Sequence, residues 1–172
     1  KPRTMLSNYV LAKGLLNAMV TFVVAFLMIF IPFMFVQYID PALNIIKYTT
    51  EFYQPTSVGT FEVLAEKSIL FYGMGYSLWV AINGALYATI AYLLSICLKN
   101  KFVALSIPFL WWVVMNFVTA ILGIPKFSPV FTVFPFAITA QPIWTIFVPF
   151  TILVLAIIGL IAFIKTKNKV WD

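Results

Sequence analysis

Two long uncharged runs flank a short polar stretch near the middle of this 172-residue sequence. Residues 68–98 before it and residues 102–125 after it contain no Asp, Glu, Lys, Arg or His. Each run is long enough to cross a bilayer, whose hydrocarbon core is about 30 Å thick. The stretch between them, Lys99-Asn100-Lys101, therefore predicts the tight turn of a transmembrane hairpin. Short loops rich in Lys and Arg stay in the cytoplasm, so the two lysines also predict the side on which the turn lies.

The composition assigns the whole chain to the membrane. Hydrophobic residues make up 63% of the sequence and charged residues only 9%, far from the balance of a soluble domain. We expect an all-α, polytopic membrane protein that forms a single transmembrane domain. Four transmembrane helices are predicted, over residues 14–38, 68–98, 102–123 and 143–164. A short amphipathic helix over residues 1–13 is expected to lead into the first of them.

Glycine and proline predict irregularities inside these spans. Residues 68–98 would measure about 46 Å as one helix, which exceeds the hydrocarbon core. We therefore expect a break or a close helix crossing at Gly73, Gly75 or Gly84. Pro32 is expected to kink the first span near its outer end.

Two further segments connect the predicted spans on the outer side. Residues 39–67 form an outer loop that carries four of the five acids. Residues 124–142 contain four prolines, so no straight helix can cross the membrane there, and a re-entrant or interfacial segment is predicted. Its phenylalanines either anchor the chain at the interface or form the outer lid of a path for an apolar substrate: Phe127, Phe131, Phe134 and Phe136.

The distribution of basic residues predicts the orientation. Eight of them fall on one side of the predicted spans: Lys1, Arg3, Lys13, Lys99, Lys101, Lys165, Lys167 and Lys169. Three fall on the other side: Lys47, Lys67 and Lys126. The richer side is expected to face the cytoplasm, which makes both ends of this chain cytoplasmic.

Several kinds of chemistry are not indicated. The sequence has no histidine and one cysteine, Cys97, so we predict no internal disulfide, no metal site and no catalytic residue. No GxxxxGK[ST] loop is present to bind nucleotide phosphates. The net charge of +6 comes from lysines at the ends of apolar runs, which sets topology and does not predict binding of nucleic acid.

Small polar side chains remain inside the predicted spans. They include Asn17, Thr21, Asn83, Asn116 and Thr119. Hydrogen bonds between helices explain such residues, and we favour that interpretation. A substrate path is the alternative, because it also needs neutral polar groups that face inward.

Two segments resemble a known family. Residues 95–109, SICLKNKFVALSIPF, are similar to the hairpin between the fourth and fifth helices of type-two ABC (ATP-binding cassette) exporter permeases. Residues 2–13, PRTMLSNYVLAK, resemble the stretch that leads that family into its third span. The proline-broken segment before the last helix and the lysine-rich tail after it also fit. The resemblance covers the last four of the family's usual six spans, and the first two have no counterpart in these residues.

The resemblance implies a partner and a role. Two permease subunits would form the path in the cell membrane, and separate ATP-binding cassette subunits would bind ATP and Mg²⁺ and hydrolyse ATP. This chain would bind no cofactor itself. The implied contacts for coupling to the ATPase are Arg3 and Lys13, with Lys99, Asn100 and Lys101 as secondary contacts. The substrate would be an amphipathic or apolar peptide, antibiotic or lipid.

A second function class stays open. The chain could be a non-transporting assembly, immunity or sensor subunit whose spans simply bind other spans. A membrane enzyme is a distant third, because the spans offer no combination of nucleophile, base and metal.

Overall fold

The computed structural model describes residues 2–39, 68–135 and 142–170. Its elements, in chain order, are α1 (Pro2–Met34), the π-helix η1 (Phe35–Ile39), α4 (Ile69–Cys97), α5 (Lys101–Ile121), the 3-10 helix η3 (Pro125–Phe127), α6 (Pro129–Val133) and α7 (Trp144–Val170). Four of these segments are long and apolar enough to cross a membrane: Tyr9–Ile39, Ile69–Cys97, Lys101–Ile121 and Trp144–Thr166. The predicted all-α polytopic fold is confirmed. Most of the predicted outer loop, residues 40–67, lies outside the described part.

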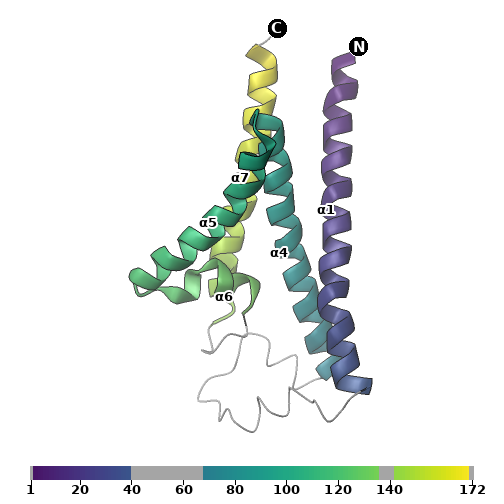
Figure 1. The fold of residues 1–172 in the computed structure, drawn as a ribbon, viewed down its shortest axis with the longest axis vertical. Coiled ribbons are helices and arrows are strands. Elements are labelled where there is room, and N and C mark those ends of the chain that lie inside the picture. Colours follow the sequence, from purple (N-terminus) through teal and green to yellow (C-terminus); the bar gives the residue numbers. More distant parts are fainter. Residues whose placement is uncertain (1, 40–67, 136–141, 171–172) are drawn as a thin grey trace.

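Helix α4 is the centre of the arrangement (Figure 1). Helix α1 packs along one side of α4, while α5 and α7 pack on it from the other side. Helix α5 leans away from α7, and η3 and α6 fill the space between them. Both chain ends and the α4–α5 turn lie at one end of the molecule, which we call the turn end. The other end, which holds η3 and α6, is the α6 end.

The first helix is longer than the predicted span. Residues 2–34 form one α-helix, so the expected amphipathic segment continues into the span without a break. Pro32 lies inside α1, and the wider π-helical turn of Phe35–Ile39 follows it. Proline removes a backbone hydrogen bond and crowds the preceding turn, which favours such an irregular end.

Two of the three glycines of α4, Gly73 and Gly84, lie where α1 approaches, and none of the three breaks the helix. Helix α4 is continuous from Ile69 to Cys97. A Cβ atom at Gly73 would collide with the ring of Phe33 on α1, and a Cβ at Gly84 would lie 3.7 Å from that of Ala25. Glycine in a helix costs only about 1 kcal/mol relative to alanine. At these two positions, the small size of glycine permits the close approach of α1.

The polar turn between α4 and α5 has a defined structure. Asn100 is the N-cap of α5, and its side-chain oxygen accepts hydrogen bonds from the backbone N–H groups of Phe102 (3.0 Å) and Val103 (3.3 Å). Two of the N–H groups that every helix start leaves without an intrahelical partner are satisfied in this way. Three residues are therefore enough to reverse the chain.

The far end of α5 closes with a Schellman motif. Gly123 adopts a left-handed conformation with φ of 70°. The N–H of Gly123 donates to the oxygen of Ala120 (3.1 Å), and the N–H of Ile124 donates to that of Thr119 (3.0 Å). This pair of bonds ends a helix and satisfies its last carbonyl groups. The chain then turns from α5 into η3.

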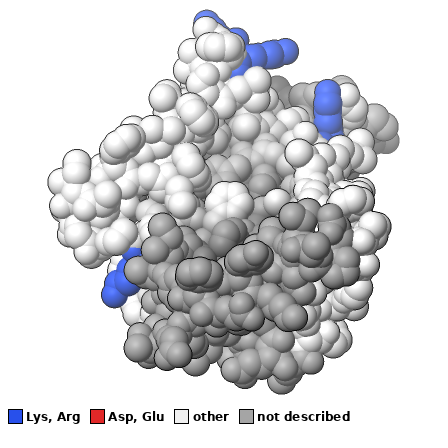
Figure 2. Space-filling view, turned by 60° about the horizontal axis from the view of Figure 1, so that its bottom comes forward, with Lys and Arg blue, Asp and Glu red and all other residues white. Residues whose placement is uncertain are grey.

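The described residues expose few charged side chains and many large apolar ones. Figure 2 shows a few blue side chains near its edges and white atoms elsewhere, apart from the grey part. Large side chains such as Met28, Phe102 and Ile121 are 70%, 79% and 84% exposed. Exposed apolar area of this extent suits contact with lipid chains and not with water.

Candidate functional site

Serine and proline form the start of α6, in the segment between α5 and α7. Ser128 is the N-cap of α6 and accepts a hydrogen bond from the N–H of Phe131 (3.3 Å), while Pro129 occupies the first helical position. Proline suits that position because its missing N–H would have no intrahelical partner there. The hydroxyl of Thr132 donates to the carbonyl oxygen of Ser128 (3.0 Å). Ser128 and Thr132 are both buried, so α6 is inserted between its neighbours.

Two long helices fix the backbone of α6. The side-chain oxygen of Asn116 on α5 accepts a hydrogen bond from the N–H of Val130 (3.0 Å). The indole nitrogen of Trp79 on α4 donates to the carbonyl oxygen of Thr132 (2.6 Å). A five-residue helix leaves the N–H groups at its start and the carbonyl groups at its end without intrahelical partners, and these two side chains satisfy one group of each kind.

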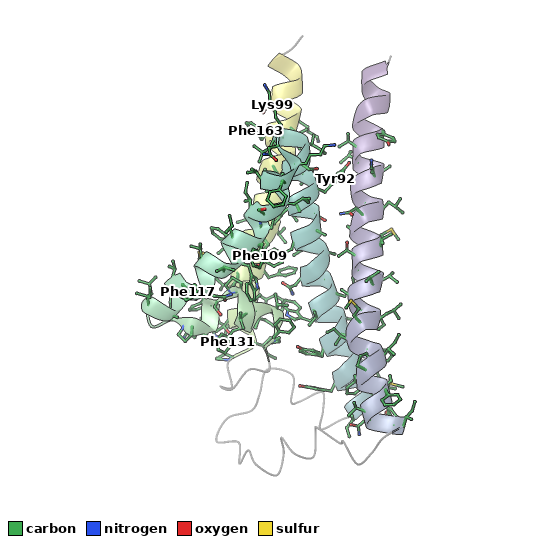
Figure 3. The ribbon with its side chains drawn as sticks, in the orientation of Figure 1. Tyr92, Lys99, Phe109, Phe117, Phe131 and Phe163 are labelled. Carbon is green, nitrogen blue, oxygen red and sulfur yellow. The ribbon has the colours of Figure 1, made fainter. Side chains whose placement is uncertain are left out.

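Aromatic rings surround the same segment. Trp79 packs against Phe147 and Phe150 of α7, with ring centroids 5.5 and 5.2 Å apart. Phe127 of η3 lies 5.8 Å from Trp144 at the start of α7. Figure 3 shows Phe131 on α6 and Phe117 on α5 near this end of the molecule. Aromatic contacts therefore join α7 to α4 on one side and to η3 on the other.

Of the four predicted lid residues, the structure describes three. Phe127, Phe131 and Phe134 are half-buried and lie in or directly after η3 and α6. Phe136 lies outside the described residues. The three described rings are held in a segment that two hydrogen bonds tie to α4 and α5.

A small cavity lies next to η3 and α6, among α4, α5 and α7. Its volume is about 30 Å³, close to that of one water molecule. It is lined by Tyr87, Trp111, Met115, Phe127, Pro129, Pro149, Ile152 and Leu153. The lining is predominantly apolar, and an apolar cavity of this kind favours a hydrocarbon group over water.

The predicted polar residues do not gather in one place. The amide of Asn17 on α1 points to the carbonyl oxygen of Ala88 on α4 at 3.5 Å, and the hydroxyl of Thr21 donates to the carbonyl of Asn17 (2.9 Å). Thr119 on α5 donates to the carbonyl oxygen of Met115 (2.8 Å). The described part of the chain therefore contains no continuous row of these side chains along a helix interface.

Asn83 is the most buried of these polar residues. Its side chain is fully buried in α4, and its amide nitrogen donates to the carbonyl oxygen of Trp79 (2.9 Å). The side-chain oxygen of Asn83 has no hydrogen-bond partner within the described residues. Because Trp79 is one turn away, Asn83 belongs to the same side of α4 as the indole that holds α6.

The residues implied in coupling lie at the turn end. Lys99 and Lys101 are exposed, and Figure 3 places Lys99 at the level of Phe163 on α7. Lys13 is exposed on α1, where its ammonium lies 5.9 Å from the ring centroid of Tyr9. Arg3 lies in the first turn of α1. Asn100 differs from the lysines, because its side chain caps α5.

A pair of contacts fixes α1 at the turn end. The hydroxyl of Tyr92 on α4 donates to the carbonyl oxygen of Val10 (3.0 Å), and Figure 3 shows this side chain directed toward α1. A Cβ atom at Gly14 would lie 2.9 Å from the Tyr92 ring. The start of α1 is therefore positioned against α4, and its first residues extend beyond the α4–α5 turn (Figure 1).

The sequence did not predict a role for Trp79, Ser128 or Thr132. An indole N–H in an uncharged span requires an acceptor, and Ser-Pro is a typical helix start, so both signals were present. Neither signal identifies its partner. Within the described ranges there is no group of three or more His, Cys, Asp or Glu residues that could hold a metal ion.

Comparison with known proteins identified no relative of this chain. No family model, no curated protein and no solved structure matches the chain.

Proposed function

We propose that this chain is the membrane-spanning permease subunit of an ATP-driven exporter of the type-two ABC class. One structural observation carries the proposal beyond the sequence resemblance. Both chain ends and the Lys99–Lys101 turn share one end of the bundle, and the proline-broken segment before the last helix packs at the other end. The last four spans of such a permease need this layout. The proposal places the protein in the cell membrane with both ends of this chain cytoplasmic.

The proposal assigns ATP hydrolysis to a separate protein. ATP and Mg²⁺ would bind to ATP-binding cassette subunits, and this chain would not be an enzyme. The first residues of α1 belong to the same 33-residue helix as most of the first span. Force applied at its first turn would be transmitted along a continuous helix that packs against α4. A second permease subunit would complete the path.

Coupling contacts follow from the basic residues at the turn end. Arg3 and Lys13 on α1 are the first candidates, and Lys99 and Lys101 are secondary ones. The side chain of Asn100 supports the turn by capping α5, so its contribution is indirect. An acidic surface on the ATPase subunit would complement these charges.

The proposed substrate is amphipathic or apolar. The described spans contain no carboxylate, and their charged residues are lysines near the ends of the spans. Aromatic rings and a small apolar cavity lie at the α6 end, between α5 and α7. Such an environment favours hydrocarbon over ions, which supports a peptide, antibiotic or lipid as cargo.

A non-transporting membrane subunit is the second candidate. One observation favours it: Asn17 and Asn116 contact other elements of the fold, and Thr21 and Thr119 bond within their own helices. Because these four side chains make contacts within the fold, they do not form the row of polar groups that a substrate path through the described residues would need. In that case the four spans would bind the spans of another protein.

The deciding experiment measures ATP hydrolysis by the purified complex. The tagged full-length protein is isolated from its native membrane, and vanadate-sensitive ATPase activity is measured in the eluate together with any co-purified Walker-motif protein. The exporter proposal predicts both, and it predicts that Lys13→Glu strongly reduces both. Lys165→Glu on α7 is the matched control, because it makes the same charge change at the same end. Absence of ATPase activity with the wild-type protein would reject the exporter and favour the second candidate.

A further inference from the structure

Lys126, Phe127 and Trp144 form a row at the α6 end. The ammonium of Lys126 lies 5.4 Å from the ring centroid of Phe127, and that ring lies 5.8 Å from Trp144. Lys126 is exposed, and Trp144 is 58% exposed. The described residues contain no Asp or Glu, so within them Lys126 has no acidic counterpart. The row therefore places an exposed positive charge beside two aromatic rings.

Phe127 connects this charge to the apolar cavity. The same ring that lies beside Lys126 also lines the cavity of about 30 Å³ between α5 and α7. Two other lining residues, Trp111 on α5 and Ile152 on α7, are 43% and 45% exposed. Since these exposed side chains border the cavity, it reaches the apolar outer surface of the helices. A cation and an opening for hydrocarbon are thus neighbours.

The position of this pair along the bundle matches a membrane interface. Helix α5 has 21 residues and is about 30 Å long, which separates Lys126 from Lys101 by the thickness of a hydrocarbon core. Tryptophan and lysine are typical of the interface, where rings lie at the level of the headgroups. The anionic groups that a bilayer itself supplies at that depth are lipid phosphates.

We propose that Lys126, Phe127 and the cavity beside Phe127 form a binding site for one anionic phospholipid. The ammonium of Lys126 contacts the lipid phosphate, Phe127 and Trp144 support the glycerol region, and hydrocarbon of one acyl chain enters the cavity beside Ile152. The charge selects an anionic headgroup, and the apolar opening selects a molecule with a chain. This site does not depend on whether the protein transports anything.

The test measures lipid binding to the full chain by native mass spectrometry after delipidation. Phosphatidylglycerol and phosphatidylcholine with identical acyl chains are titrated separately. One lysine near a membrane surface contributes an attraction that corresponds to about a fivefold change in affinity. We expect the wild-type protein to prefer phosphatidylglycerol, and we expect Lys126→Gln to reduce this preference about fivefold. The matched control Lys165→Gln, on the other end, retains the wild-type preference.

A second variant tests the hydrocarbon part of the site. Ile152→Trp places a larger side chain at the opening and is expected to weaken binding of both lipids while the preference between them remains. If Ile152→Trp does not fold, Met115→Phe fills the cavity from α5 instead. Glycerol phosphate, which lacks a chain, should not displace the bound lipid.

Three results would overturn the proposal. The first is equal preference in the wild-type protein and in Lys126→Gln. The second is an equal loss of preference in Lys165→Gln, which would assign the effect to overall charge. The third is displacement of the lipid by glycerol phosphate, which would identify a site for small phosphates.

Discussion

The indole nitrogen of Trp79 on α4 donates a 2.6 Å hydrogen bond to the carbonyl oxygen of Thr132 on α6. Fifty-three residues separate the two partners in the sequence. Together with the bond from Val130 to Asn116, this contact attaches a five-residue helix to two long ones. The stability of the α6 end should therefore depend on two side chains that belong to the central helices.

Trp79→Phe should destabilise the protein although it keeps an aromatic ring. The change removes the N–H and leaves the carbonyl of Thr132 without this donor, which costs about 1 to 3 kcal/mol. The free energy of unfolding is measured by SDS titration in mixed micelles. Trp112→Phe on α5 is the control, because that indole makes no hydrogen bond within the described residues. Equal losses in the two variants would contradict the assigned role of the Trp79 N–H.

Two asparagines should respond differently to the same substitution. Asn116→Ala removes the acceptor for the backbone of α6, and we expect a loss of about 1 to 3 kcal/mol in the free energy of unfolding. Asn17→Ala removes a contact of 3.5 Å on an exposed side chain, so its cost should stay near or below about 0.6 kcal/mol. Protease sensitivity of the α5–α7 connection should rise only in Asn116→Ala.

Gly73→Ala should weaken the crossing of α1 and α4. The added methyl group meets the ring of Phe33, and such overpacking costs about 1 to 3 kcal/mol. Gly159→Ala on α7 is the control, because no atom lies within 4 Å of the new methyl group. That variant should gain stability, by up to about 1 kcal/mol from helix propensity. In the Gly73→Ala background, Phe33→Leu should restore part of the loss if the ring is the obstacle.

Asn100→Ala should lower stability through the start of α5. Loss of an N-cap costs about 1 kcal/mol, and Asn100→Asp should retain most of it because the carboxylate accepts the same bonds. The free energy of unfolding of both variants distinguishes capping from a purely electrostatic role of the turn. If Asn100→Ala and Asn100→Asp are equally stable, the hydrogen bonds to Phe102 and Val103 are not what supports the turn.

The glycines and prolines were only partly interpretable before the structure. From the sequence, Gly73 was compatible with either a break in α4 or a close helix crossing. The structure shows a continuous α4 with the ring of Phe33 on α1 packed against Gly73. The prolines of residues 124–142 excluded a straight helix, which agrees with the short η3 and α6 that the structure describes there. Which helices would hold that segment depended on pairings between distant residues, and local sequence does not encode those.

The sequence by itself determined that this is a helical membrane protein with a tight turn at residues 99–101. A chain in lipid must satisfy its backbone hydrogen bonds internally, and only α-helices and closed barrels do so. The long uncharged runs of this sequence have the length of transmembrane helices. Only the tertiary structure decided which polar groups meet. Trp79 and Asn116 lie on different helices, and both bind the backbone of α6. Helix α6 fits between α5 and α7 because α5 leans away from α7. That geometry comes from side-chain packing, which a pattern of hydrophobic residues does not specify.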